Sequence, residues 1–287
     1  MLSKLYYFFI SMRPKQWIKN LIIFIPLFFS KEFLNLTSVF SVFIVFIVFS
    51  LFCWATYIIN DYMDLDKDKN HPKKKNRPMA SWKINPKYAV IFAILLLVLL
   101  LVCSYFIWNI RLLCLLLAYF LNTMLYSFFV KKIEILDVFS IAIWFMIRGI
   151  IWAILINVEI SIWLLVMLFL GALWFWFVKR YQEVKLGEKT RDNIFKYNDY
   201  FLEQTISMLT WIIIITYILY TFNSVQSKVM VITVPFVTFW MIRFLYNIFF
   251  LKRYEDWIED IFLRDKYILF DIILFVLLVI SVFIFDI

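Results

Sequence analysis

The stretch IINDYMDLDKDKNHPKKKNRPMA, residues 58–80, decides how the whole chain is organised. It places four Asp and seven Lys, Arg or His residues between two long apolar runs. The chain around it is 65% hydrophobic and 22% aromatic, with a mean hydropathy of +0.88, which lies far outside the range of soluble domains. This composition predicts an integral membrane protein, with the ionic stretch at a membrane boundary.

Apolar runs of roughly 20 residues, the length that crosses a bilayer as a helix, recur along the chain. We expect helices because an open strand edge in lipid would leave backbone groups unpaired. The nine predicted spans are about Trp17–Phe33, Leu36–Asn60, Tyr88–Trp108, Leu112–Val130, Leu136–Ile156, Ile160–Val178, Thr205–Phe222, Val229–Phe250 and Tyr267–Phe285. The sequence therefore predicts an all-α, polytopic bundle that forms one membrane domain over residues 1–287.

The basic residues predict which side of the membrane each connection faces. With the N-terminus inside, 24 of the 29 Lys and Arg residues fall in inner segments, and the outer connections hold only Lys31, Arg111 and Lys228. This asymmetry is typical of the positive-inside rule and predicts an N-in, C-out topology. The polar material then lies on the cytoplasmic face, where the net charge of +9 suits anionic headgroups, anionic substrates or both.

The aspartates of the opening stretch have a spacing that suits metal chemistry. Asp61, Asp64 and Asp68 stand at i, i+3 and i+7, which puts three carboxylates on one face of a helix. Mg²⁺ favours one or two carboxylates together with substrate phosphate oxygens. The following Lys73 and Arg77 are candidates to bind those phosphates. The alternative reading is a solvated loop of mixed charge without a ligand.

The segment NDYMDLDKDKNHPKKKNRPMAS from Asn60 resembles the NDxxDxxxD motif of the UbiA superfamily of intramembrane prenyltransferases, including the HP and RP-x-A-S continuation of its phosphoribosyl-transferring branch. Three further segments resemble that branch in the same order. They are RPKQWIKNLIIFIPLFF from Arg13, YSFFVKKIEILDVFSIAIWFMIRG from Tyr126, and SIWLLVMLFLGALWFWFVKRYQEVK from Ser161. The resemblance therefore covers most of the chain.

The resemblance implies a nine-helix, Mg²⁺-dependent transferase in a bacterial or archaeal plasma membrane, with its active site facing the cytoplasm. That branch moves 5-phosphoribose from 5-phosphoribosyl 1-diphosphate to decaprenyl phosphate or a similar polyprenyl phosphate. The acceptor is already an anion, so no strong general base is needed, and the chain has a single His. The implied partners are these two substrates and membrane lipids, with no nucleic acid. Whether the chain forms a homo-oligomer stays open.

A second polar group is predicted at the inner ends of the fourth and fifth spans, formed by Tyr126, Lys131, Lys132 and Asp137. The lysines have an alternative as residues that extend to lipid headgroups. A carboxylate at the start of a span is costly unless it faces water or an ion. Asp137 resembles the superfamily's second acidic position, where it would support the metal or orient a basic neighbour. The fuller DxxxD of quinone-type relatives is missing, which argues against two metal ions.

Arginine inside a predicted span also indicates function, because its desolvation has to be compensated by a partner. Arg148 stands within the matched fifth span and is a candidate to bind a phosphate or an aspartate. Arg243 matches nothing in the family pattern and is left out as a residue that extends to the interface. The other predicted substrate-binding residues are Lys19, Asn20, Asn60, Lys179 and Arg180.

Two observations keep alternatives open. The family pattern ends RP-x-A-S with Gly, whereas this chain has Trp82, so either the loop or the substrate differs. The same metal chemistry would also serve a prenyltransferase that moves an isoprenoid from its diphosphate to an aromatic quinone precursor. A non-catalytic transporter or scaffold is the third hypothesis, although the sequence has no clear inverted repeat or Gly/Pro-broken span pair.

Overall fold

A computed structural model describes residues 2–13, 17, 20, 24, 27, 35–70, 74–108, 110–155, 161–187, 196–223, 228–254 and 258–285. Every regular element in those ranges is a helix, which confirms the all-α prediction. The chain divides into two compact units, the first formed by Met1–Phe128 with Ile147–Ile160 and the second by Phe129–Met146 with Ser161–Ile287. The expectation of one domain over the whole chain stays a prediction.

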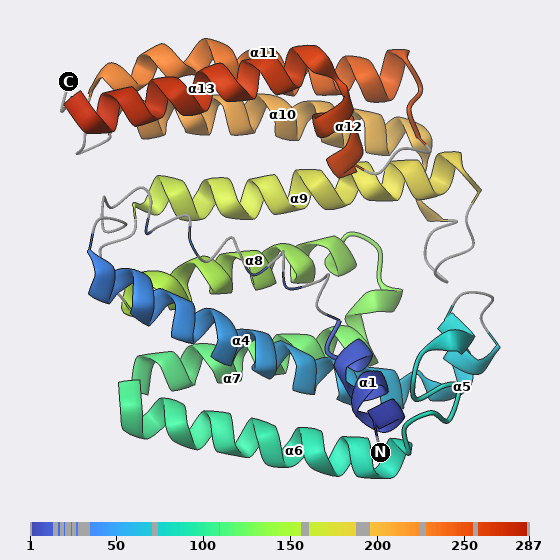
Figure 1. The fold of residues 1–287 in the computed structure, drawn as a ribbon. Coiled ribbons are helices and arrows are strands. Elements are labelled where there is room, and N and C mark those ends of the chain that lie inside the picture. Colours follow the sequence, from blue (N-terminus) through green and yellow to red (C-terminus); the bar gives the residue numbers. More distant parts are fainter. Residues whose placement is uncertain are drawn as a thin grey trace. The chain divides into compact units, whose positions relative to one another are not determined.

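The first unit is built around a long helix, α4, which packs along α6 and also contacts α7 (Figure 1). Its helices are α1 (Leu2–Ser11), α4 (Leu36–Met63), α5 (Leu65–Lys69), α6 (Pro86–Cys103), α7 (Ile110–Phe128) and the second half of α8 (Leu136–Leu155). Asparagine begins two of them, because the side chains of Asn35 and Asn85 accept the N–H two residues later. Pro86 then starts α6 with a preset φ.

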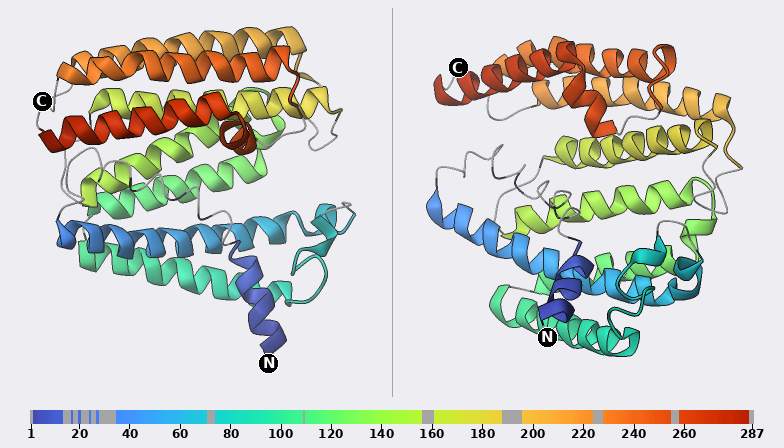
Figure 2. Two further views of the ribbon diagram at one scale, coloured as in Figure 1. Left: turned by 45° about the horizontal axis from the view of Figure 1, so that its top comes forward. Right: turned by 45° about the vertical axis from the view of Figure 1, so that its right-hand side comes forward.

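The second unit contains two helix pairs, α9 with α10 and α11 with α13, which the views in Figure 2 also display. Its helices are the first half of α8, α9 (Ile162–Lys185), α10 (Asp199–Phe222), α11 (Val234–Leu245), α12 (Ile258–Arg264) and α13 (Lys266–Phe285). Trp174 on α9 donates a 2.8 Å hydrogen bond from Nε1 to Oγ1 of Thr210 on α10. Near the end of α9, Tyr181 donates to Glu203 at 2.7 Å.

Six helical segments in the described ranges are long and apolar enough to cross a membrane. They are Leu36–Met63, Pro86–Phe106, Ile110–Phe128, Ile162–Lys185, Asp199–Phe222 and Val229–Phe250. Two further predicted spans correspond to the 20-residue helices α8 and α13. The first predicted span, Trp17–Phe33, lies mostly outside the described residues. The chain is an integral membrane protein, while nine spans and the N-in, C-out topology stay predictions.

Large apolar side chains that the protein itself leaves uncovered agree with a lipid environment. On α6 they include Ile91, Leu95 and Leu99, and on α13 Phe270 and Leu277. Soluble monomers rarely expose contiguous apolar faces of this kind. A bilayer covers such faces at no cost, because lipid tails are as apolar as these side chains.

Two features of the backbone cannot be predicted from the hydrophobicity of the sequence. The apolar runs that contain α6 and α11 each end in a π-helical turn, Ser104–Trp108 and Tyr246–Phe250. Among the residues that the structure describes, four non-glycine residues have a positive φ, namely Arg13, Trp82, Ile135 and Lys252. Left-handed backbone is disfavoured for any residue with a Cβ atom, and most of all for a β-branched one. Three of these residues lie beside or within the matched polar segments.

Candidate functional site

The first predicted acidic group lies where α4 ends. Asn60 and Asp61 belong to the last turn of α4, and Asp64 caps the helix with φ −91° and ψ 8°. A new helix, α5, begins at Leu65 and carries Asp68. The spacing of the aspartates predicts one continuous helical face, whereas the chain breaks at Asp64 without a Gly or Pro to mark the break.

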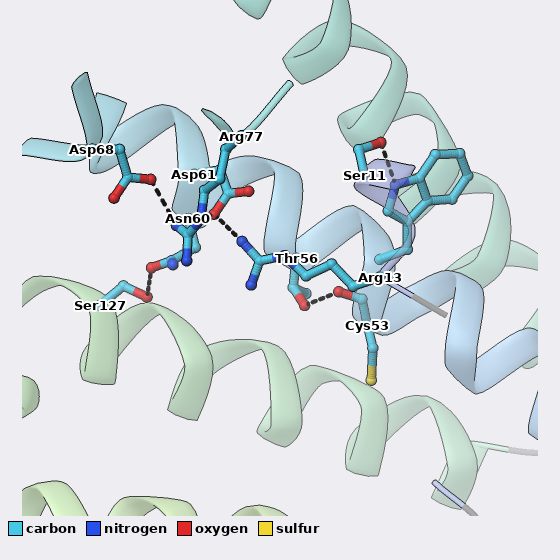
Figure 3. Close-up of polar contacts among 10 residues, drawn as sticks. Ser11, Arg13, Cys53, Thr56, Asn60, Asp61, Asp68, Arg77 and Ser127 are labelled. Atoms are coloured by element: carbon cyan, nitrogen blue, oxygen red, sulfur yellow. Dashed lines mark hydrogen bonds and ion pairs between the residues drawn. The ribbon is translucent and has the colours of Figure 1, made fainter. Parts of the chain in front are cut away.

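Arg77 brings two of the three aspartates together (Figure 3). Its Nη1 donates to Oδ1 of Asp61 at 3.0 Å and to Oδ2 of Asp68 at 2.6 Å. The RPMAS segment forms the turn that carries Arg77, because the backbone N–H and the hydroxyl of Ser81 both donate to its carbonyl. Both aspartates are buried, and the Arg77 side chain is 27% exposed.

Arg13 is a second cation on the same carboxylate, and it is not among the site residues predicted from the sequence. Its guanidinium pairs with Oδ1 of Asp61 and lies 5.1 Å from the ring centre of Tyr57. Arg13 adopts φ 52° at the end of the α1 segment. Its position as the first residue of the matched RPKQWIKN segment is the signal that could have identified it. We name Asp61, Asp68, Arg13 and Arg77 the Asp61–Arg77 cluster.

Asn60 connects this cluster to α7, since its Oδ1 accepts a 2.7 Å hydrogen bond from the hydroxyl of Ser127. Ser127 is buried and lies next to the predicted Tyr126, which is half-buried. A contact 67 residues apart in the chain therefore fixes the end of α4 beside the end of α7.

The Asp61–Arg77 cluster has the chemistry of a divalent-cation site with few protein ligands. Within the described ranges, no three Asp, Glu, His or Cys side chains lie close enough together to hold a metal ion. Two carboxylates nevertheless share one cationic nitrogen, and the described residues leave Oδ2 of Asp61 and Oδ1 of Asp68 without a hydrogen bond. Mg²⁺ needs no more than one or two carboxylates when substrate phosphates complete its shell. The donor set therefore fits Mg²⁺ with a bound diphosphate.

A buried arginine lies deeper in the first unit. Arg148 on α8 donates from Nη2 to the hydroxyl of Tyr119 at 3.0 Å. Its guanidinium also lies 5.4 Å from the Tyr119 ring centre and 5.8 Å from that of Phe49. Asn20, another predicted residue, is buried and donates to Ser50 at 3.1 Å. Both predicted residues thus face the interior of this unit.

The second unit holds a different acidic and basic group around Asp137, at the start of α8. Oδ2 of Asp137 accepts from Nε of Arg180 at 3.1 Å, and Oδ1 accepts from the hydroxyl of Tyr197 at 2.9 Å. Nη1 of Arg180 also donates to Oε2 of Glu183 at 2.6 Å. The side chains of Asp137 and Arg180 are both 0% exposed. We name Asp137, Arg180, Glu183 and Tyr197 the Asp137–Arg180 cluster.

Two titratable side chains in the loops beside this cluster, Glu134 and Tyr197, have shifted pKa values. The hydrogen bond from Lys196 lowers the pKa of the Glu134 carboxyl, and the two groups are 2.5 Å apart. Burial raises the pKa of the Tyr197 phenol, and the charge of Asp137 acts in the same direction. Tyr197 is therefore a neutral hydrogen-bond donor at neutral pH.

Arg243, which the sequence analysis leaves out, has a structural partner. Its Nε pairs with Oδ2 of Asp265 at 3.0 Å, and Asn247 donates to the same oxygen at 2.8 Å. The other oxygen of Asp265 accepts the N–H groups of Tyr267 and Ile268 at the start of α13. Burial alone would raise the pKa of Asp265, but these hydrogen bonds hold it below its usual value. Arg243 thus stabilises a helix start and does not simply extend to the interface.

With this geometry in place, the family comparison identifies the fold. The sequence model of the UbiA prenyltransferase family matches residues 21–262, which is most of the chain. The chain belongs to the UbiA prenyltransferase family. It is therefore an enzyme of the UbiA transferase type, and the family predicted from the sequence motifs is confirmed.

Several curated UbiA family relatives are similar to this chain. A decaprenyl-phosphate phosphoribosyltransferase of Corynebacterium glutamicum is 28% identical over 234 residues, which are 76% of this chain and 68% of the relative. An enzyme of the same name from Mycolicibacterium smegmatis is 29% identical over 227 residues, which are 76% of this chain and 71% of the relative.

Solved UbiA structures share the fold at low sequence identity. A UbiA homolog from Archaeoglobus fulgidus bound to GPP and Mg²⁺ superposes with a TM-score of 0.66 at 17% identity, covering 84% of this chain and 87% of that one. A digeranylgeranylglyceryl phosphate synthase superposes with a TM-score of 0.65 at 22% identity, covering 99% and 96% of the two chains. These likenesses show the fold.

The remaining residues predicted for this UbiA family member lie outside the two clusters or outside the described ranges. Lys19 and Lys73 are not among the described residues. Lys131 is half-buried and Lys132 exposed, both in the short 3₁₀ turn before α8. Lys179 is half-buried and its Nζ lies 4.7 Å from the ring centre of Trp176. Tyr197 is not among the residues predicted from the sequence, and Arg13 is indicated only by its place in the RPKQWIKN segment.

Proposed function

We propose that this UbiA family enzyme transfers 5-phosphoribose from 5-phosphoribosyl 1-diphosphate to a polyprenyl phosphate of the decaprenyl type, at the cytoplasmic face of the membrane and with Mg²⁺. The observation that carries the diphosphate chemistry is the pair of carboxylates, Asp61 and Asp68, that meet on Arg77 beside Arg13. The names of the curated relatives, which match about three quarters of the chain, favour phosphoribose as the transferred group.

Asp61 and Asp68 are the proposed metal ligands, and Asp64 stays a proposed third. When bound, Mg²⁺ would neutralise negative charge that develops on the leaving diphosphate. The cluster also supplies two guanidinium groups, Arg13 and Arg77, which bind phosphate oxygens with charge-assisted hydrogen bonds. A site that holds both carboxylates and guanidinium groups suits a substrate that arrives as a metal-bound diphosphate.

The reaction balances without a strong base. The bond between ribose C1 and the diphosphate oxygen breaks, and its electron pair leaves with the diphosphate. An oxygen of the polyprenyl phosphate forms the new bond to C1. That oxygen is already ionised, so proton abstraction is not required, which fits a cluster formed by acidic and basic residues without a histidine among those described. Arg148, Lys179 and Arg180 are further proposed phosphate ligands.

One observation favours a second function. The A. fulgidus UbiA homologs with the same fold were solved with Mg²⁺ and either GPP or DMAPP. Both of these ligands are isoprenoid diphosphates. The same carboxylates would then bind an isoprenyl diphosphate, and an aromatic ring would accept the isoprenoid.

A donor comparison separates the two functions. Purified protein in nanodiscs would receive Mg²⁺ and either labelled phosphoribosyl diphosphate with a polyprenyl phosphate, or a labelled isoprenyl diphosphate with an aromatic acceptor. We expect label in the lipid phase from phosphoribosyl diphosphate, no turnover in excess chelator, and recovery when Mg²⁺ is restored. Transfer of the isoprenoid alone would replace the first function by the second. Transfer from neither donor would argue against both.

A further inference from the structure

We propose that Tyr197 is a positioning residue, which fixes Asp137 so that Asp137 orients the guanidinium of Arg180 toward a phosphate group of the substrate. The inference rests on the proposed function, because Arg180 is a phosphate ligand only in that proposal. Tyr197 is not among the site residues predicted from the sequence, although the family model covers its position. It lies just before α10, separated in the chain from Asp137 by 60 residues.

The hydroxyl of Tyr197 is held both as a hydrogen-bond acceptor and as a donor. Its oxygen accepts the backbone N–H of Ile135 at 2.7 Å, and its proton is donated to Oδ1 of Asp137 at 2.9 Å. A phenol has one proton, so accepting from Ile135 leaves it free to donate to the carboxylate. Burial raises the pKa of Tyr197, which keeps that proton on the phenol. Tyr197 therefore couples the position of the turn at Ile135 to the position of the Asp137 carboxylate.

The turn that Tyr197 holds is conformationally unfavourable. Ile135 has φ 66°, and the N–H of Leu136 donates to the carbonyl of Glu134 at 2.6 Å, which closes a three-residue turn around Ile135. A β-branched residue rarely adopts such a backbone and needs surrounding contacts to keep it there. Two adjacent residues supply these contacts, since Lys196 pairs with Glu134 while Tyr197 binds Ile135. The turn places Asp137 in the first turn of α8.

Asp137 in turn acts on Arg180. One oxygen of Asp137 accepts from Tyr197 and the other from Nε of Arg180. The Nη1 atom of Arg180 is held by Glu183. Because the guanidinium is planar, bonds at Nε and Nη1 fix its orientation and therefore the direction of Nη2. Of the two roles expected for Asp137, support of the metal and orientation of a basic neighbour, this geometry favours the second.

The experiment compares Tyr197→Phe, Asp137→Asn and the double variant in full-length protein. We expect Tyr197→Phe to raise KM for one phosphate substrate by about tenfold, the loss expected when a buried hydrogen bond to a charged group is removed. Measuring KM for the donor and the acceptor separately identifies which phosphate Arg180 binds. The kcat value is expected to change little. The double variant should be no worse than Asp137→Asn alone, because both changes interrupt one path to Arg180.

Tyr200→Phe is the matched control, because this side chain is exposed and its hydroxyl makes no hydrogen bond among the described residues. It should behave as the parent protein. Unchanged KM values in Tyr197→Phe, or effects of the two single variants that multiply in the double variant, would overturn the inference.

A second background separates positioning from simple support of the turn. Glycine tolerates a positive φ, so Ile135→Gly should restore thermal stability to Tyr197→Phe, or allow it to fold if it does not. The KM defect should remain, since the bond to Asp137 is still missing. Recovery of KM together with stability would reduce Tyr197 to a structural residue and refute the proposal.

Inorganic diphosphate and polyprenyl phosphate provide readouts that do not depend on turnover. If the parent protein fails to use phosphoribosyl diphosphate, the proposed function fails, and binding of these two probes still tests Tyr197. A weaker affinity of Tyr197→Phe for either probe, with Tyr200→Phe unchanged, supports positioning. Equal affinities of all three proteins for both probes contradict it.

Discussion

The Asp61–Arg77 and Asp137–Arg180 clusters use the same residue types and differ in their access to the surroundings. Arg77 is partly exposed and lies between two carboxylates that each keep one oxygen without a hydrogen bond from the described residues. Asp137 and Arg180 are fully buried, and both oxygens of Asp137 are bonded. An open ion pair is able to exchange one partner for a ligand, whereas a buried one holds its side chains in a fixed orientation, as proposed above for Arg180.

Burial also changes what each pair contributes to stability. A partly exposed pair contributes little, because water and salt screen it. A buried pair is weak evidence for net stabilisation, but removing one partner leaves an uncompensated charge and is strongly destabilising. The comparison therefore predicts that loss of a charged residue mainly affects turnover in the first cluster, and that in the second cluster it also destabilises the fold.

The largest expected effect is on turnover in the first cluster. Asp61→Asn and Asp68→Asn should each lower kcat by about a hundredfold or more, because the proposed cation would lose a charged ligand. Asp64→Asn tests the third carboxylate in the same assay. Turnover at saturating Mg²⁺, with the midpoint of thermal unfolding measured beside it, is the readout.

Asp66→Asn is the matched control, since the Asp66 side chain is 94% exposed and pairs only with Lys69 among the described residues. It removes the same charge from α5, the helix that carries Asp68, and should leave turnover near that of the parent protein. Near-normal turnover in Asp61→Asn and Asp68→Asn would mean that the metal site lies elsewhere. An equal loss in Asp66→Asn would mean that only the local net charge matters.

The second effect is on stability in the sealed cluster. Asp137→Ala should lower the free energy of unfolding by about 3–5 kcal/mol, because Arg180 is left buried without one of its carboxylates. Asp61→Ala is the matching substitution in the first cluster and should cost less, because the Arg13 and Arg77 side chains left behind keep partial access to water. Denaturation in one detergent compares the two. Similar losses of stability in both variants would break the contrast between the clusters.

The sequence predicts the spans well because apolar length is a local property of the chain. The runs that become α4, α7, α9 and α10 are visible at once, and the family predicted from the motifs is confirmed. Local spacing also identifies Asp61 and Asp68. It fails at Asp64, where α4 ends, because the cause of that break does not lie in a Gly or Pro at that position.

The contacts that complete each cluster escape sequence reasoning because they join distant parts of the chain. Arg13 reaches Asp61 across 48 residues, and Tyr197 reaches Asp137 across 60. Neither has a charge spacing or helical period that links it to its partner. Asp137 illustrates the same limit. Its place at the start of a span shows that the carboxylate needs a partner, but not that Tyr197 and Arg180 are the partners of its two oxygens.

The smallest expected effect concerns the two positive-φ turns next to the clusters. Trp82 stands where the family pattern predicts glycine. Its backbone has φ 57° and its side chain is 63% exposed, so the substitution bears on the backbone conformation of the turn. Its N–H donates to the carbonyl of Met79, and its ring lies 5.6 Å from Nζ of Lys69. A glycine at this position would adopt the left-handed conformation of this turn without strain.

Trp82→Gly should raise the free energy of unfolding by about 1 kcal/mol or less, because relief of the strained φ exceeds the extra entropy of a glycine in the unfolded chain. Trp82→Ala keeps a Cβ atom and therefore the strain, so it should not gain stability. Thermal unfolding of the two variants isolates the backbone term, since both lose the contact with Lys69. A gain in both would assign the effect to the indole. The KM values should not change in either Trp82 variant. The turn at Ile135 differs, because Tyr197 and Asp137 connect it to Arg180, and there we expect a change in the contacts of Tyr197 to alter KM.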